Sequence, residues 1–360
     1  MEINELSLKE KIGQLFMVGI NDKTTEQVER LIKEYKIGGV VIYRKNYSNY
    51  KEMIELVNNI KTINSKNDIP IFISIDQEGG RVNRMPSEIL NIPSATKLAN
   101  TQNLEIIKES GDIIGTMLRE TGISMDYAPI LDIKRFDEKH AIGNRCYGEN
   151  KQDVEKYAIE VMKSIKEKGV IPVVKHFPGH GLTKKDSHFR IPKITEKIEN
   201  LEKEDMVPFE KAIESGADAI MVGHLILKDI DKKYPASLSK KVIQNYLIEK
   251  YNYKGLIITD DLKMMAIRIH YNMNKAVLKA IEAGNDIVMI GLSYNKIKKI
   301  IKYITKKVQK GKLSIETINK SIIKIQEMKK KYNVTDEKIN GFVIDEINDR
   351  IDSLTKQVAK

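Results

Sequence analysis

The chain has 360 residues, of which 41% are hydrophobic, and a formal net charge of +11 at pH 7. No apolar run reaches the ~18 residues of a membrane-spanning helix, and the N-terminus lacks a basic stretch followed by a long apolar core. We therefore expect a cytoplasmic protein that does not enter a membrane. The single cysteine, Cys146, excludes an intrachain disulfide framework, and lysines spread along the whole chain favour a solvated surface over a nucleic-acid-binding face.

Amphipathic helical segments alternate with short apolar runs that are rich in β-branched residues. The predicted helices begin at residue 7 and then cover 24–35, 47–64, 103–121, 151–168, 202–215, 240–250, 273–283, 295–310 and 314–331. The predicted strands lie at 16–19, 38–43, 69–75, 125–131, 170–174, 219–223, 256–259 and 286–290. This alternation of strands and helices is typical of an α/β fold with a parallel sheet.

Polar residues stand where apolar runs stop, at Asp76, Asp132, Lys175, His224 and Asp260. In a (β/α)8 barrel the active-site residues come from the C-terminal ends of many strands, whereas a doubly wound sheet needs only a few of them at one switch point. We therefore predict a single (β/α)8 TIM-like barrel with a C-terminal helical extension. The catalytic barrel is expected over residues 1–330, followed by a charged, helical tail at 331–360.

Asp260 and Asp261 directly follow the predicted strand 256–259. A carboxylate at the end of a buried strand is poorly solvated, so nearby cations must keep it ionised or its pKa rises. Such a group can act as a nucleophile toward an electrophilic carbon. The alternative is that one of the two aspartates caps the following helix, and spacing alone leaves both roles open.

Three of the six histidines lie in the stretch 175–188, which reads KHFPGHGLTKKDSH. Asp186 precedes His188 by two residues, and in an extended segment this spacing points both side chains the same way. The aspartate can then raise the basicity of the imidazole, which suits a general acid/base near neutral pH. A zinc site built from His176, His180 and His188, or a simple turn, are alternatives that the spacing leaves open.

The segment 76–84, which reads DQEGGRVNR, offers further polar groups at the expected barrel mouth. Asp76 and Arg84 suit the recognition of hydroxyl and carbonyl groups, with a structural ion pair as the alternative. Arg145 is a weaker candidate for the same role. The pair of glycines lacks the strand, Gly-x-Gly-x-x-Gly and helix arrangement of a dinucleotide site, and we expect no cofactor.

Taken together, these motifs resemble glycoside hydrolase family 3, and specifically its β-N-acetylglucosaminidase branch. The resemblance is carried by 76–84 (DQEGGRVNR), 128–132 (APILD), 144–148 (NRCYG), 175–181 (KHFPGHG), 186–188 (DSH), 235–239 (PASLS) and 259–264 (TDDLKM). It extends in family order from about residue 5 to about residue 300. No single motif is sufficient, but the set is highly specific.

The resemblance implies a retaining exo-glycosidase on a TIM-like barrel. It implies that Asp260 is the nucleophile and that the acid/base is His188, paired with Asp186 on a loop. The sugar-binding positions that it implies are Asp76, Arg84, Arg145, Lys175 and His176. It also removes the need for a metal. The expected substrate is an N-acetylglucosamine-containing glycan, in particular peptidoglycan fragments, and a monomer is favoured.

Some residues depart from the family pattern. Leu182 stands where the branch often has Asp, Thr259 where Ser is common, and 265–267 (MAI) where Glu-Gly-Ala is frequent. These differences concern subsite preference and loop packing and leave the catalytic assignment intact. A phosphorylase that passes the same intermediate to phosphate, another β-glycosidase of the family and a silent sugar-binding protein are the alternatives.

Overall fold

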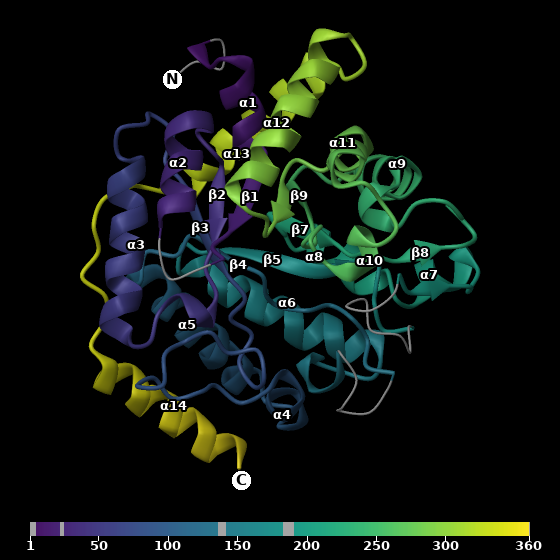
Figure 1. The fold of residues 1–360 in the computed structure, drawn as a ribbon. Coiled ribbons are helices and arrows are strands. Elements are labelled where there is room, and N and C mark those ends of the chain that lie inside the picture. Colours follow the sequence, from purple (N-terminus) through teal and green to yellow (C-terminus); the bar gives the residue numbers. More distant parts are fainter. Residues whose placement is uncertain (1–4, 22–24, 136–141, 183–190, 360) are drawn as a thin grey trace.

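The computed structural model describes residues 5–21, 25–135, 142–182 and 191–359, and Figure 1 shows helices packed around a central set of strands. The strands of the central sheet are β1 (Phe16–Gly19), β2 (Gly39–Val41), β3 (Phe72–Ile75), β4 (Met125–Asp126), β5 (Ile171–Phe177), β7 (Ala219–Val222), β9 (Leu256–Thr259) and β10 (Val288–Ile290). A separate parallel pair joins β6 (Lys193–Ile194) and β8 (Ile226–Leu227).

All eight central strands are parallel, in the order β10-β1-β2-β3-β4-β5-β7-β9. An isolated parallel bridge between Ile258 and Ile287 connects the two ends of this series, so the sheet curls into a barrel. Each predicted strand overlaps one observed strand, and β5 continues three residues beyond the predicted 170–174. The prediction of a TIM-like barrel with a C-terminal helical extension is confirmed.

Most helices follow the predicted segments, usually with shorter ends, but the short helices Ala95–Asn100 and Met265–Arg268 were not predicted. The helices are α1 (Leu8–Gln14), α2 (Glu26–Tyr35), α3 (Tyr50–Asn64), α4 (Ala95–Asn100), α5 (Leu104–Glu120), α6 (Lys151–Glu167), α7 (Ile198–Lys203), α8 (Val207–Glu214), α9 (Lys240–Val242), α10 (Met265–Arg268), α11 (Met273–Ala283), α12 (Tyr294–Gln309), α13 (Ile315–Lys331) and α14 (Ile344–Val358). Single short turns lie at η2 (Arg44–Asn46), η3 (Gly143–Arg145) and η4 (Ala236–Leu238), and η5 (Ile243–Lys250) continues α9 with π-helical geometry.

The helix predicted over 202–215 is wrong in one respect, because the structure divides this region between α7 and α8. Pro208 lies in the first turn of α8. A proline has no N–H to donate and its ring clashes with the carbonyl of the residue four positions earlier, so a continuous helix through Pro208 is disfavoured. In the first turn the missing N–H costs nothing, and α8 begins there instead.

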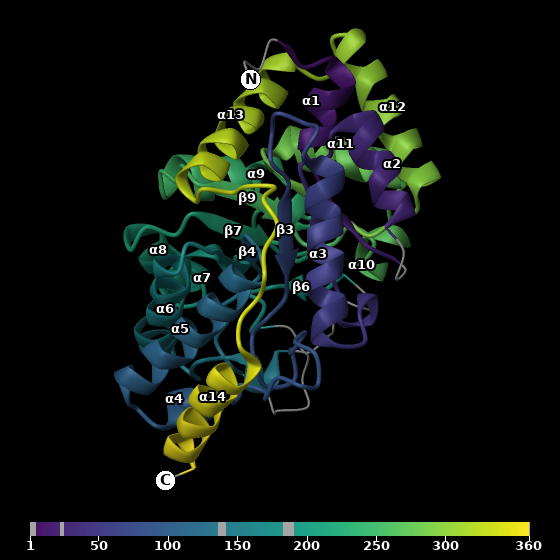
Figure 2. The ribbon, with the colours of Figure 1, turned by 90° about the vertical axis from the view of Figure 1, so that its left-hand side faces the viewer.

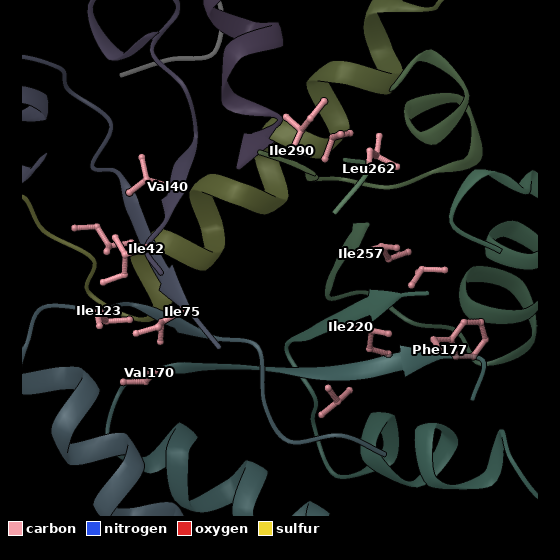
Figure 3. Close-up of a cluster of buried hydrophobic side chains, with 14 of the residues drawn as sticks. Val40, Ile42, Ile75, Ile123, Val170, Phe177, Ile220, Ile257, Leu262 and Ile290 are labelled. Atoms are coloured by element: carbon pink, nitrogen blue, oxygen red, sulfur yellow. The ribbon is translucent and has the colours of Figure 1, made fainter. Parts of the chain in front are cut away.

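Alternate residues of each strand pack on opposite sides of the barrel wall. Val40 and Ile42 lie with the side chains between strands and helices, as do Ile75 and Ile220 (Figure 3). Val41, between the first two, belongs instead to the cluster inside the barrel. Burying one such aliphatic side chain stabilises the fold by about 1.5–3 kcal/mol.

The cluster inside the barrel extends to α13, which supplies Ile325 and Met328, and to Tyr332 directly after this helix. Lys329 on the same helix is 3% exposed. Its Nζ donates hydrogen bonds to the Gly38 carbonyl at 3.0 Å and to Gln14 Oε1 at 3.2 Å. Helix α13 is therefore joined to the segments before β1 and β2 by a buried amine.

The chain after α13 first runs alongside α3 as an extended segment and then forms α14 (Figure 2). Asp336 accepts hydrogen bonds from Asn64 Nδ2 at 2.7 Å and from the Ile71 N–H at 3.2 Å. The Asn58 side chain donates to the Ile339 carbonyl and accepts from its N–H, both at 2.9 Å. No helix within the described part of the chain is long and apolar enough to cross a membrane.

Lys329 provides a test of the packing between α13 and the barrel. Burial lowers the pKa of Lys329 to about 7, although the Asp336 carboxylate opposes this shift. Above pH ~7 the amine is neutral in the folded state and protonated in the unfolded state, so unfolding takes up a proton. The free energy of unfolding should therefore rise with pH, relative to a Lys329→Met variant, by up to ~1.4 kcal/mol per pH unit between pH ~7 and ~9. Urea unfolding of both proteins at three pH values measures this difference, and a pH-independent difference would contradict it.

Candidate active site

The polar residues predicted at strand ends come together at one mouth of the barrel. Asp76 follows β3, Lys175 and His176 lie near the end of β5, and Asp260 follows β9. In parallel strands the C-terminal ends face the same edge, so residues far apart in the sequence become neighbours. The contacts below connect the segments after β3, β4, β5, β7 and β9.

A cluster of one buried cation, one partly buried cation and two carboxylates lies between β3 and β5. Lys175 is 2% exposed, and its Nζ lies 2.8 Å from Asp76 Oδ1 and 2.7 Å from Glu78 Oε1. Arg145 binds Glu78 in a bidentate manner, with Nε 2.7 Å from Oε2 and Nη2 2.7 Å from Oε1. Each buried charge thus has an opposite charge at hydrogen-bond distance, as burial requires.

Glu78 was not among the candidate residues selected from the sequence, although it lies in the segment 76–84. Burial alone raises the pKa of its carboxyl, but Arg145 and Lys175 outweigh this effect and hold the pKa far below its usual range. The same carboxylate raises the pKa of Arg145 and contributes to raising that of Lys175. Its position between the candidates Asp76 and Arg84 in the same motif was the signal available in the sequence.

The carboxylate of Asp132 contacts two of the histidines, His176 and His180. It is fully buried, its Oδ2 lies 2.7 Å from His176 Nδ1, and its Oδ1 accepts from the His180 N–H at 2.7 Å. Burial opposes ionisation, but the two histidines and the backbone donor lower the pKa of Asp132 below its usual value. Burial also lowers the pKa of His180 to about 4. His180 therefore stays neutral near pH 7.

The two adjacent aspartates after β9 have different environments. Asp261 accepts hydrogen bonds from the Lys263 N–H at 2.8 Å and the Gly291 N–H at 3.2 Å, and thereby ties its loop to the segment after β10. Burial raises the pKa of Asp261 to about 6. Asp260 makes one such bond, which it accepts from the Asp261 N–H at 2.7 Å.

Asp260 is held in its ionised form. Burial raises the pKa of its carboxyl, but the nearby His224 and His176, the Asp261 N–H and Lys175 together bring the pKa below its usual value. His224 is fixed beside it, with Nδ1 2.7 Å from Ser237 Oγ and Nε2 3.1 Å from the Asp261 carbonyl. Asp260 is thus a partly accessible carboxylate that accepts a single hydrogen bond from the described residues.

Arg84 lies on the same rim, held by its backbone. Its N–H donates to Gln77 Oε1 at 2.7 Å and its carbonyl accepts from the Tyr47 hydroxyl at 2.7 Å. The guanidinium makes no hydrogen bond or ion pair with another described residue, so it is available to a ligand. Tyr43, which the sequence did not single out, lies near the same groups. Burial, Asp261 and Asp76 raise the pKa of its hydroxyl, and Arg84 opposes this shift.

Asp186 and His188 lie outside the residues that the structure describes. The described segment closest after them begins at Ile191, which packs against Ile226 and Ala266. Ala266 belongs to α10, the helix that follows Asp260. The described chain therefore resumes at Ile191 next to the helix that follows Asp260.

No group of three potential metal ligands occurs among the described His, Cys, Asp and Glu residues. The alternative zinc site of His176, His180 and His188 includes one residue, His188, that lies outside the described part of the chain. The donors that the site does present are N–H and ammonium groups, and the acceptors are carboxylates. Such groups bind the hydroxyls of a polar ligand and place the Asp260 carboxylate beside it.

Comparisons with known proteins give one family over most of the chain. Residues 7–328 match the family model described as glycosyl hydrolase family 3 N terminal domain. The chain is 30% identical over 333 residues to the β-hexosaminidase LpqI of Mycobacterium tuberculosis, covering 90% of this chain and 83% of that protein. It is 31% identical over 281 residues to a β-hexosaminidase of Photobacterium profundum, covering 78% and 82%.

A solved structure is similar over almost the whole chain. It is that of a glycoside hydrolase family 3 β-N-acetylglucosaminidase from Paenibacillus sp. str. FPU-7, with a TM-score of 0.91 and 32% sequence identity. The similarity covers 98% of this chain and 69% of that one. The matched region therefore includes most of the C-terminal segment after α13.

Replacing Glu78 by Gln tests whether Arg145 and Lys175 depend on this carboxylate. Removing one partner of a buried ion pair typically costs about 3–5 kcal/mol, so we expect a loss of about 3 kcal/mol in the free energy of unfolding at pH 7. The difference should shrink as the pH falls below ~4, because Glu78 becomes protonated in the unfolded chain there while it stays ionised in the native protein, which lowers the free energy of unfolding of the unmodified protein. Urea unfolding measures it. The control is Glu149→Gln, since Glu149 pairs with Lys134 at 73% side-chain exposure and should matter by less than ~1 kcal/mol; equal effects of the two changes would contradict the assignment.

Proposed function

The chain belongs to glycosyl hydrolase family 3, and from that premise we propose that it is a retaining exo-β-N-acetylglucosaminidase. It is a glycoside hydrolase of the β-N-acetylhexosaminidase type, in keeping with its relatives. The proposed reaction removes N-acetylglucosamine from the non-reducing end of a β-linked glycan. The observation that supports it most is Asp260, an ionised and partly accessible carboxylate at the end of β9, beside the polar cluster of the barrel mouth.

The proposed sugar-binding residues are Asp76, Arg84, Arg145, Lys175 and His176. Lys175 and Arg145 offer N–H donors that carboxylates hold in place, and Asp76 offers a carboxylate oxygen to a hydroxyl. Hydrogen bonds that involve a charged partner are about twice as strong as neutral ones. Because their partners fix these groups beforehand, little side-chain entropy is lost when the sugar binds.

The proposed first step forms a glycosyl-enzyme intermediate. The Asp260 carboxylate attacks C1 as the bond from C1 to the glycosidic oxygen breaks, and His188 transfers its proton to that leaving oxygen. Asp186 is proposed to orient the imidazole and to raise its basicity. In the second step His188 takes a proton from water while the water oxygen attacks C1, which releases Asp260 and N-acetylglucosamine with retained β configuration.

Several finer assignments are part of this proposal. Peptidoglycan fragments are the proposed natural substrate, and a monomer is proposed as the active form. Cytoplasmic location stays a prediction, as does the division into a catalytic barrel at 1–330 and a tail at 331–360. No metal is assigned a role in the reaction.

The central prediction concerns Asp260. Purified protein in phosphate-free buffer without added metal should hydrolyse 4-nitrophenyl N-acetyl-β-glucosaminide and release N-acetylglucosamine itself, which a phosphorylase requiring phosphate would not do. Asp260→Ala should lower kcat by about 10³-fold or more, because no covalent intermediate can form. Azide should restore turnover and yield the α-glycosyl azide. Full activity of Asp260→Ala would refute the nucleophile assignment.

The loss of kcat/KM on replacing His188 should be larger for a substrate whose leaving group needs a proton to depart. In His188→Ala the loss in kcat/KM should be small, about 10-fold, for the 4-nitrophenyl glycoside, whose leaving group is acidic, and about 10³-fold for a β-linked disaccharide. Side-by-side kinetics on the two substrates measure the ratio. His180→Ala is the comparison, because a neutral buried histidine should affect both substrates equally. Equal losses for His188→Ala would argue against its role as the acid.

A further inference from the structure

The segment between β3 and α4 carries Asp76, Glu78 and Arg84 and is folded back on itself. Gly79 and Val82 form an antiparallel bridge, in which the Glu78 N–H donates to the Val82 carbonyl at 3.0 Å. The Gly80 N–H then donates to the Ile92 carbonyl at 2.8 Å. We call residues 78–92 the sugar loop. Its two edges are thus joined to each other close to Glu78.

Two glycines allow this fold. Gly79 and Gly80 have φ values of +80° and +54°, which favour glycine. A Cβ on Gly80 would lie 2.7 Å from that of Ser94. The Asn91 side chain also donates to the Gly80 carbonyl at 2.6 Å. The position of Gly80, two residues from Glu78, therefore depends on where residues 91 and 92 lie.

The outer edge of the sugar loop is bound by the C-terminal helix α14. Asn348 Oδ1 accepts from the Leu90 N–H at 2.8 Å, and Asn348 Nδ2 donates to the Glu88 carbonyl at 2.9 Å. Leu90 itself is 46% exposed. Its side chain therefore contributes little packing there. The paired hydrogen bonds of Asn348 hold this edge together with the buried side chain of Ile89 and the hydrogen bond that Glu88 Oε1 accepts from the Tyr50 N–H at 3.1 Å.

Helix α14 has an anchor of its own that does not involve the sugar loop. Arg350 donates to Glu109 Oε1 through Nε at 3.0 Å and through Nη2 at 2.9 Å, and to Asp112 Oδ1 at 2.7 Å. Both acceptors lie on α5. Ile347 and Ile351 are buried beneath the same helix. The helix is thus docked on the barrel by residues other than Asn348.

We propose that Asn348 is a positioning residue for the sugar site. Through Glu88 and Leu90 it fixes the outer edge of the sugar loop, the paired edges then fix Gly79 and Gly80, and these place Glu78 between Arg145 and Lys175. The inference rests on the proposed function in one respect, since it takes those two cations to bind the sugar. Under this proposal the C-terminal helix α14 helps to position residues of the sugar site.

The test compares Asn348→Ala with Arg350→Gln on the same helix. Asn348→Ala should raise KM for 4-nitrophenyl N-acetyl-β-glucosaminide by about 5- to 10-fold, the effect of two hydrogen bonds, with kcat changed less than about twofold. Arg350→Gln should lower the melting temperature at least as much and leave KM unchanged. Asn348→Asp keeps the acceptor for Leu90 and loses the donor to Glu88, so an intermediate KM is expected. A KM that is unchanged in Asn348→Ala, or raised equally in Arg350→Gln, overturns the proposal.

Amide hydrogen exchange gives a readout that does not need activity. The Gly80 and Val82 amides, which donate to Ile92 and Gly79, should exchange at least about 10-fold faster in Asn348→Ala and unchanged in Arg350→Gln. If the wild-type protein shows no hydrolysis, the proposed function fails, and the exchange result alone decides the inference. Faster exchange at these two amides in Asn348→Ala alone supports it. Equal exchange in both variants contradicts it.

Discussion

Burial of Lys175 is the interaction on which the site depends most. An ammonium group that is 2% exposed costs several kcal/mol to desolvate, and it is tolerated only where opposite charges approach it closely. Asp76 and Glu78 supply these charges from the segment after β3, and Glu78 also holds Arg145. Three segments from different parts of the chain must therefore meet at one point. Closure of the barrel brings the ends of β3 and β5 to the same mouth and makes this possible.

The charge of Asp260, the proposed nucleophile, follows from the same arrangement. Asp260 and Asp261 are adjacent and both poorly solvated, yet the pKa of Asp261 rises to about 6 while that of Asp260 falls. The difference arises from position. Asp260 lies toward His176, His224 and Lys175, whereas Asp261 points toward the backbone after β10 and holds the loop. One residue is thus ionised beside the proposed sugar site, and its neighbour supports the turn.

Much of this architecture could be predicted from local sequence pattern. Short apolar runs mark all eight strands, and the polar residues at their ends mark the mouth, because strand burial and parallel pairing are expressed in contiguous residues. Contacts between distant segments leave no such trace. The residues that flank Asn348 and Glu78 in the sequence do not indicate which side chains these two residues contact, because the contacts join segments that are distant in the sequence and form only in the folded chain. The break between α7 and α8 could have been predicted from Pro208, whereas the placement of Asp186 and His188 lies outside the described residues.

The account depends centrally on Asp260 as the residue that becomes bonded to the sugar. A slow-reacting N-acetylglucosamine derivative with a good leaving group, such as a 5-fluoro glycosyl fluoride, should trap this intermediate. Mass spectrometry of the digested protein is predicted to find one added 2-acetamido sugar, on the peptide that contains Asp260 and at that residue. A label on another carboxylate, or inactivation without a covalent sugar, would contradict the account.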